Sequence, residues 1–230
     1  MKTLNQEIRE YLLEEGASLV GFANLTELPE NTRNNFPRGI SIAVALSPAS
    51  VQEIGQGLAQ EYWKACSQVN AKLDELGLGA ERFLKDRGFA AQARTTRVVK
   101  IDQTARTTDL PHKTVATRAG LGWIGKCALC ITPGFGAAQR FTCVLTDAPL
   151  ECGHPINQSG CGDCVVCQEI CPSGAVSGHN WFAGLERDRF FDAAKCFNYI
   201  AEFRKTTGCA DTTCGRCVKA CPWTQKYLNN

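Results

Sequence analysis

The sequence lacks any apolar run long enough to cross a membrane, so we expect no transmembrane segment and no membrane partner. Met1–Gly16 is charged and has helical spacing, which is not the pattern of a secretion signal, and twin arginines that would direct export are absent. The formal net charge is only +2, which gives no electrostatic reason to expect nucleic-acid binding. These absences predict a cytoplasmic protein.

Cysteine, in contrast, is abundant, with 14 in the chain. Many cysteines without an export signal indicate a reducing compartment. One dense run ends in a Cys-Pro pair and comprises Cys161, Cys164, Cys167 and Cys171. A second run also ends in a Cys-Pro pair and comprises Cys214, Cys217 and Cys221, with Cys196 and Cys209 upstream. Such spacing is typical of proteins that bind two iron–sulfur clusters and carry single electrons.

The spacing also predicts which thiolates share a cluster. In two-cluster ferredoxins the fourth cysteine of each run binds the other cluster. The first 4Fe–4S cluster is therefore expected on Cys161, Cys164, Cys167 and Cys221. The second is expected on Cys171, Cys214, Cys217 and one further group. A regular run would place that eighth ligand at Asp211, but a carboxylate is less usual than a thiolate, which leaves Cys196 and Cys209.

Zinc and disulfides are the alternatives for these cysteines. Zinc sites use separated Cys-x-x-Cys pairs, and the first run crowds its cysteines more densely than one tetrahedral ion needs. A disulfide framework does not fit a reducing compartment. We therefore favour iron–sulfur clusters.

Upstream of the cysteine runs, helices and strands alternate, which favours an α/β architecture. We expect strands at 18–23, 40–46 and 141–146. A long helix is expected to begin at a capping box of Ser50 and Glu53 and to end near Gly77 and Gly79. Its apolar stripe comprises Val51, Ile54, Leu58, Tyr62, Cys66, Val69, Leu73 and Leu76, so Cys66 is read as core. Shorter helices are expected at 81–87 and 112–119.

A change to Gly, Pro, Asn and Ser near residues 151–160 predicts a linker. The expected domains are an α/β cofactor or substrate domain, 1–155, and a small ferredoxin-like α+β domain with two 4Fe–4S clusters, 156–230.

The middle of the chain contains a glycine-rich loop. Gly120, Gly122 and Gly125 match G-x-G-x-x-G, but no well-formed strand precedes them, so a dinucleotide site is a weak alternative. Cys127 and Cys130 follow directly. They are read as packing residues, with two alternatives: a redox-active pair, or a third metal site with Cys143 and Cys152.

The segments AGLGWIGK, ITPGFG and VLTDAPL, followed by the first cysteine run, KCFNYI and the second run, closely resemble the epoxyqueuosine reductases, distant relatives of reductive dehalogenases. The resemblance covers most of residues 111–224 and implies two 4Fe–4S clusters and a nitroreductase-like α/β domain that binds cobalamin, with flavin a less favoured cofactor. It implies that Cys196 is the eighth cluster ligand. It also implies that Gly120, Leu121, Gly122 and Trp123 lie near the corrinoid.

The chain departs from this family at the proposed acid. The family's catalytic Asp has no counterpart in register, its Asp-Tyr-His segment is missing, and its C-terminal helical extension is not present in this sequence. Asp109, His112 and Lys113 are our candidates for the acid or for substrate contacts.

We therefore expect a corrinoid-dependent reductase of a small substrate rather than a tRNA enzyme, and we do not expect tRNA as a partner. A ferredoxin or flavodoxin type of donor would supply electrons, and a homodimer is a candidate assembly. The alternative is a non-catalytic electron carrier or reductive activator of a partner's cofactor.

Overall fold

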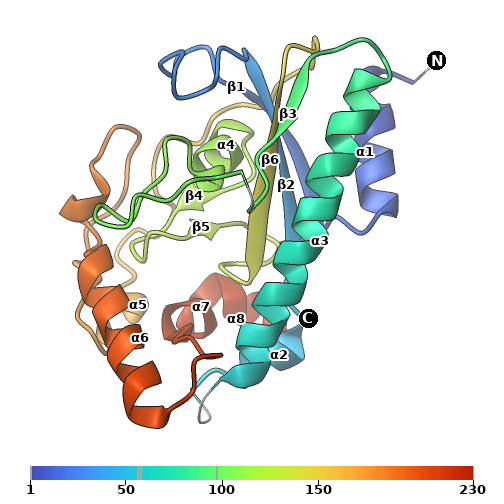
Figure 1. Cartoon of the computed structure of the whole chain (residues 1–230). Helices are drawn as coiled ribbons and strands as arrows, with labels where there is room; N and C mark the ends of the chain where they lie inside the picture. Colours follow the sequence, from blue (N-terminus) through green and yellow to red (C-terminus); the bar gives the residue numbers. More distant parts are fainter. Residues whose placement is uncertain (1, 56–58, 97, 230) are drawn as a thin grey trace. The chain divides into compact units, whose positions relative to one another are not determined.

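The computed structural model describes residues 2–55, 59–96 and 98–229 (Figure 1). Its strands are β1 (Leu19–Asn24), β2 (Arg38–Ala45), β3 (Ala91–Ala93), β4 (Trp123–Ile124), β5 (Cys130–Ile131) and β6 (Gln139–Thr146). Its helices are α1 (Leu4–Glu14), α2 (Pro48–Gln52), α3 (Gln60–Lys85), α4 (His112–Arg118), α5 (Val166–Glu169), η1 (Arg187–Arg189), α6 (Ala193–Thr207), α7 (Arg216–Ala220) and α8 (Pro222–Leu228). A mixed α/β fold is thus confirmed.

The chain forms two compact units, and each is built from separate segments. The first unit comprises Met1–Val44, Val69–Leu121 and Arg140–Ile156. The second unit comprises Ala45–Gln68, Gly122–Gln139 and Asn157–Asn230. The division of the chain into domains at 1–155 and 156–230 stays a prediction.

The first unit is organised around a four-stranded sheet with the order β1-β2-β6-β3. β1 pairs antiparallel with β2, and β3 pairs antiparallel with β6. The strands at 18–23, 40–46 and 141–146 are confirmed within one or two residues by β1, β2 and β6. The fourth strand of this sheet, β3, was not predicted, because its three residues are too few for a clear alternation of apolar and polar side chains.

Apolar side chains project from both faces of this sheet, because successive strand residues point to opposite sides. On one face, Val20 and Phe22 of β1 pack with Leu73 and Leu76 of α3 and with Ile8 of α1. Figure 1 shows α1 beside α3 on this face. On the other face the core contains Ala23, Leu25, Leu110, Val115, Ala119, Cys143 and Leu145. Helix α4 therefore lies opposite α1 and α3.

The long helix differs from its prediction at both ends. The capping residue is Ser47, whose hydroxyl accepts from the Ser50 amide, so the predicted box of Ser50 and Glu53 is wrong. The apolar stripe is divided between α2 and α3, and Leu58 lies outside the described residues. Helix α3 also continues through Gly77 and Gly79 and absorbs the helix expected at 81–87. A Cβ at position 79 would meet the Tyr11 hydroxyl at 2.5 Å, so this glycine serves packing rather than termination.

The second unit has little sheet and several short helices. The β4–β5 pair is antiparallel, with Trp123 opposite Ile131. Helix α7 contacts α2, α5 and α8. Helix α6 begins at Asp192, whose side chain accepts from the Lys195 amide, and ends at Gly208 in a left-handed conformation. The described helices include none that is both long and apolar enough to span a bilayer.

Candidate functional site

Four cysteines that are distant in sequence line one cavity of about 90 Å³ in the second unit. They are Cys161, Cys164, Cys167 and Cys221, the set expected for the first cluster. The Cys164 amide donates to the Cys161 carbonyl in a tight turn, and Cys167 lies in α5. Cys221 precedes α8, and Pro222 occupies the first turn of that helix. The local turns thus place thiols from both cysteine runs around a common space.

The environment of Cys221 has two opposing effects on its thiol. Burial raises the pKa of Cys221, while backbone amides of Thr224 and Trp223 donate to its sulfur and partly offset that rise. Amide hydrogen bonds to a cluster's thiolates stabilise negative charge on sulfur. The start of α8 is therefore suited to a charged, metal-bound thiolate.

A second group of thiols contains Cys171, Cys196 and Cys214. Burial, followed by the charges of Cys214 and Cys171, raises the pKa of Cys196 to about 11. Cys171 differs: burial raises its pKa, but the Ser173 hydroxyl and nearby backbone amides outweigh burial and lower it overall. Cys209 accepts a 3.2 Å hydrogen bond from Gln60 Nε2. The structure thus groups Cys196 with two expected ligands.

Three consecutive residues, Gly125, Lys126 and Cys127, also line the cysteine cavity. Lys126 and Cys127 are 3% and 4% exposed and lie there beside the four thiols. The thiols of Cys167 and Cys217 both act on the Cys127 thiol. Contact with Cys167 favours the thiolate, but contact with Cys217 and burial outweigh it, so the pKa of Cys127 is raised. The interpretation of Cys127 as a packing residue therefore leaves out the effect of two proposed cluster ligands on its thiol.

Cys130, Cys143 and Cys152 lie elsewhere. Cys130 pairs with Ile124 in β5, and the sulfur of Cys143 lies 3.4 Å from His112 Nδ1. Cys152 donates weakly to the Leu150 carbonyl. Within the ranges that the structure describes, no three His, Cys, Asp or Glu side chains are grouped as for a single metal ion.

The glycine loop packs closely against its own chain. Gly120 has φ of +74°, and a Cβ there would lie 2.7 Å from the His154 carbonyl oxygen. A Cβ at Gly122 would lie only 2.0 Å from the Ile131 carbonyl oxygen. The Leu121 side chain fills the space over Gly21. Close backbone approach thus accounts for these glycines, and contact of this loop with a corrinoid stays a prediction.

Trp123 follows the loop and is 7% exposed. Its ring lies edge-on to Trp223, with 5.2 Å between the ring centroids. Its Nε1 is buried and has no hydrogen-bond partner among the described residues. Since Trp223 lines the cysteine cavity, Trp123 supports one wall of that cavity from behind.

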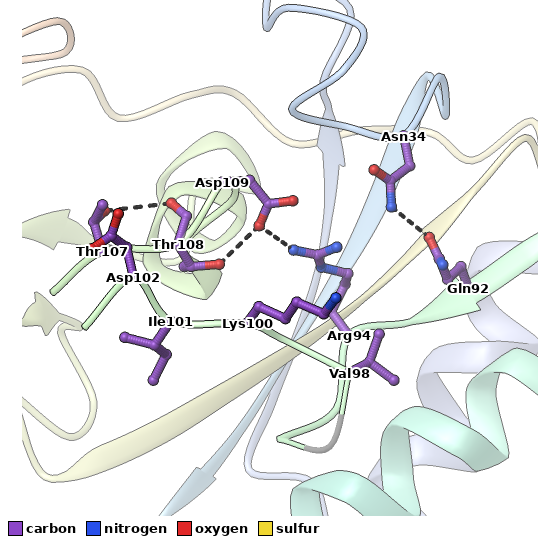
Figure 2. Close-up of a pocket in the computed structure, with 10 residues that line it drawn as sticks. All are labelled: Asn34, Gln92, Arg94, Val98, Lys100, Ile101, Asp102, Thr107, Thr108 and Asp109. Atoms are coloured by element: carbon purple, nitrogen blue, oxygen red, sulfur yellow. Dashed lines mark hydrogen bonds and ion pairs between the residues drawn. The ribbon is translucent and has the colours of Figure 1, made fainter. Parts of the chain in front are cut away.

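The first unit holds a larger and more open cavity of about 690 Å³ (Figure 2). Its lining comprises Asn34, Gln92, Arg94, Val98, Lys100, Ile101, Asp102, Thr107, Thr108 and Asp109. Arg94 directly follows β3 and is 4% exposed. Figure 2 shows its guanidinium directed at Asp109, and Nη2 lies 2.6 Å from Oδ1. Arg94 Nε is buried without a partner among the described residues.

Asp109, a candidate acid, lies in this cavity as a carboxylate. Burial raises its pKa, but hydrogen bonds from the Thr108 hydroxyl, the Leu110 amide and Arg94 lower it overall. All three donors bind Oδ1, at 2.8, 3.0 and 2.6 Å. At neutral pH Asp109 is thus an acceptor and a negative charge, and a proton on it would oppose Arg94.

His112 and Lys113, the other candidates, begin α4. Burial, followed by the charges of Arg94 and Arg140, lowers the pKa of His112 to about 4. The imidazole is therefore neutral near pH 7. Lys113 is half-buried. Sequence reasoning missed Arg94, because nothing in its local pattern signals burial; only the fold places it beside Asp109.

Among known proteins, the chain is similar in sequence to curated epoxyqueuosine reductases. No protein-family model matches the chain. The epoxyqueuosine reductase of Salmonella typhimurium is 31% identical over 200 residues, which cover 83% of this chain and 46% of that protein. The epoxyqueuosine reductase of Escherichia coli is 31% identical over 121 residues. The chain spans less than half the length of these curated relatives.

Solved structures share the fold. A catabolic reductive dehalogenase in complex with 3-bromo-4-hydroxybenzoic acid has a TM-score of 0.73 at 17% identity, covering 94% of this chain and 31% of that one. An epoxyqueuosine reductase with an epoxyqueuosine-modified tRNA-Tyr stem loop has a TM-score of 0.63 at 21% identity, covering 96% of this chain and 65% of that one.

The second of these structures corrects the prediction about partners. We did not expect tRNA as a partner, because of the weak net charge and the family extension that this sequence does not contain. That expectation is wrong, since a protein whose fold matches nearly all of this chain was solved with a tRNA stem loop. The net charge of a whole chain is a poor guide to nucleic-acid binding, because a local positive surface can bind phosphate whatever the total charge is.

The residues alone had pointed to the same family. The evidence was the order of the motifs: the glycine loop, the first cysteine run, a single cysteine and the second cysteine run. The alignment with the Salmonella protein extends it over most of the chain. The resemblance is therefore confirmed, and this chain is a relative of the epoxyqueuosine reductases.

Proposed function

We propose that the chain is a cobalamin-dependent reductase supplied with electrons through two 4Fe–4S clusters. The observation that carries the proposal is the shared cavity of Cys161, Cys164, Cys167 and Cys221, which unites thiols from both cysteine runs. The relatedness to reductases supports the reaction class. A reducing, cytoplasmic setting suits such clusters.

The donor set fits iron–sulfur clusters. Thiolates are their usual ligands, and four line a cavity bounded by apolar Ile131 and Trp223. Cys171, Cys196, Cys214 and Cys217 would hold the second cluster in a ferredoxin-like domain. Lys126 would balance the negative charge of the first cluster, and the α8 amides would bind the Cys221 sulfur.

The larger cavity fits a polar cofactor or substrate. Its volume lies in the range of ligand pockets, and it combines a buried Arg94 Nε lacking a partner with hydroxyl and amide side chains. A solved reductive dehalogenase of this fold is described as B12-dependent, which favours a corrinoid over a flavin. When bound, the corrinoid would supply the cobalt chemistry that breaks a carbon–oxygen or carbon–halogen bond.

The chain's own residues would orient the substrate and control protons. Asp109 Oδ1 is held by three donors, which leaves Oδ2 as the oxygen for a substrate hydroxyl. Neutral His112 carries one ring N–H, and its burial keeps that proton away from bulk water. Arg94 fixes Asp109 and presents a positive charge to the cavity.

The test is anaerobic purification followed by corrinoid reconstitution. We expect about eight iron atoms per chain, as two 4Fe–4S clusters require, and a corrinoid spectrum at equal stoichiometry. The reduced protein is then given either an epoxyqueuosine-modified tRNA stem loop or 3-bromo-4-hydroxybenzoic acid. Product from either substrate supports the reductase. Full iron without corrinoid binding or turnover would favour an electron carrier, and zinc in place of iron would contradict the proposal.

A further inference from the structure

The segment that follows β3 contributes most of the lining of the larger cavity in the first unit. Backbone hydrogen bonds hold this segment in place. At its start, the Arg94 amide donates to the Cys143 carbonyl of β6 at 2.8 Å. Farther along, the Asp102 amide donates to the Thr107 carbonyl, also at 2.8 Å. The segment is thus anchored to the sheet where it begins and closed on itself near its end.

Two cationic side chains of this segment, Arg94 and Lys100, line the cavity. A guanidinium has five N–H donors, and Asp109 accepts from the Nη2 of Arg94. Arg94 Nε has no partner among the described residues. Among the lining residues drawn in Figure 2, Lys100 has no hydrogen bond or ion pair. The cavity therefore presents N–H groups of two cations that its own walls do not use.

The two carboxylates that line the cavity lie in different places. Asp109 compensates Arg94 directly, across 2.6 Å. Asp102 is held by its own turn, where its Oδ1 accepts from two backbone amides at 2.8 Å. Figure 2 shows Asp102 on the opposite side of the cavity from Arg94 and Lys100. With one carboxylate beside two cations, the end of the cavity at Arg94 and Lys100 has a net positive charge.

Apolar side chains of the same segment also line the cavity. Val98 and Ile101 are 47% and 59% exposed. Exposed aliphatic side chains gain free energy when the apolar surface of a ligand removes them from water. The lining is therefore complementary to a molecule that joins an anionic group to an apolar body.

We propose that Arg94 and Lys100 form a subsite for a carboxylate or phosphate group of the substrate, and that Val98 and Ile101 contact an apolar part of the same molecule. A guanidinium and an ammonium bind both kinds of anion through charge-assisted hydrogen bonds. That the bound molecule is the substrate of a reductase rests on the proposed function, whereas the binding of an anion requires neither corrinoid nor turnover.

The test is isothermal titration calorimetry of the anaerobically purified full chain, before corrinoid is added. The probes are benzoate, phenyl phosphate and benzamide, which is an uncharged analogue of benzoate. We expect at least one of the two anions to bind, and benzamide to bind at least about tenfold more weakly, because it lacks the charged hydrogen bonds. The relative affinities of benzoate and phenyl phosphate distinguish a carboxylate subsite from a phosphate subsite.

Variants identify the residues that bind the anion. Lys100→Gln should weaken anion binding about two- to fivefold, the effect of one exposed ion pair, and Lys100→Arg should restore it. Lys85→Gln is the matched control, because Lys85 is also exposed, belongs to the first unit and lies outside the cavity. Arg94 is buried, so Asp109→Asn tests it instead. This variant removes the negative charge beside Arg94 and should tighten anion binding by a similar factor.

Several results would overturn the inference while leaving the proposed function intact. They are binding of neither anion, equal affinities for benzoate and benzamide, equal effects of Lys100→Gln and Lys85→Gln, and weaker anion binding in Asp109→Asn. A chain that shows the expected charge-dependent binding but takes up no iron or corrinoid would contradict the proposed function and leave the anion subsite in place.

Discussion

The buried guanidinium of Arg94 is held by the half-exposed carboxylate of Asp109, with Nη2 and Oδ1 2.6 Å apart. Arg94 has a side-chain exposure of 5%, so it depends on this carboxylate more than Asp109 depends on Arg94. We expect Asp109→Ala to lower the free energy of unfolding by about 1–3 kcal/mol, less than for a fully buried pair because water screens Asp109. Urea unfolding measures this change.

The matched control for this pair is the double variant Arg94→Met, Asp109→Ala. It removes the buried charge together with its partner, so part of the lost stability should return. If the single variant Asp109→Ala unfolds at the same urea concentration as the wild type, the pair contributes nothing to the free energy of unfolding.

His112 should give the protein a pH-dependent stability. Burial, followed by Arg94 and Arg140, lowers its pKa from 6.5 to about 4. Between these values the unfolded chain binds a proton that the folded chain does not, so stability is complete above pH 6.5 and falls as the pH drops toward 4. We expect His112→Gln to flatten this dependence, which is worth up to about 3 kcal/mol over the whole window.

The measurement is urea unfolding at several pH values within that window. His179→Gln is the control, because His179 is exposed and should leave the slope unchanged. If the unfolding free energy of His112→Gln still falls with pH as steeply as that of the wild type, another group causes the loss of stability in acid.

Gly122 should tolerate no side chain. A Cβ there would lie 2.0 Å from the Ile131 carbonyl oxygen, and backbone cannot move aside as a flexible side chain can. We expect Gly122→Ala to cost about 1–3 kcal/mol or more, as overpacking does. Gly134 has nothing within 4 Å of its Cβ position, so Gly134→Ala should be neutral or slightly stabilising. Equal thermal midpoints for the two variants would contradict this prediction.

Sequence patterns predicted local structure well where the deciding contacts were local. Helix α1 and strands β1, β2 and β6 follow from apolar spacing. Gly79 was misread, because its role comes from Tyr11, which is far away in sequence and packs against the helix where a Cβ would stand. A glycine that admits a distant ring looks the same in sequence as one that ends a helix.

The candidate site shows the same limit. The pairing of Cys221 with the first cysteine run could be predicted, because the spacing rule of two-cluster ferredoxins includes that long-range connection. No such rule connects Cys127 to Cys167 or Arg94 to Asp109. Both contacts depend on turns and strand ends that bring separate segments together, and only the fold supplies them.

Cys196 and Cys209 should respond differently to removal. The charges of Cys214 and Cys171 act on Cys196, whereas Cys209 contacts Gln60. We expect Cys196→Ala to lower the iron content from about eight to about four atoms per chain, because one cluster loses a ligand. Cys209→Ala should keep full iron, and loss of iron in that variant instead would transfer the ligand role to Cys209.

Removing the charge of Lys126 should stabilise the iron-free protein but weaken its retention of iron. Its side chain is buried at 3% exposure and acts on the Cys167 thiol, with no carboxylate paired to it in the described parts of the chain. We expect Lys126→Met to stabilise the iron-free protein, because a buried ammonium is removed, and to weaken iron retention. Urea midpoints and iron content measure the two effects.

Lys126→Arg keeps the charge and should retain iron. Equal iron retention by Lys126→Met and the wild type would show that the cation does not compensate the thiolates.

The cavity that joins Cys221 to Cys161, Cys164 and Cys167 has a consequence for biosynthesis. A ribosome synthesises Cys221 after the three earlier cysteines, so a nascent polypeptide displays those thiols before their partner exists. Under the proposed ligand sets, neither cluster can acquire all four of its ligands until the second cysteine run has been synthesised. Cluster insertion must then wait for the second run, and the cell's iron delivery machinery would meet a polypeptide in which every segment of the first unit has already been synthesised.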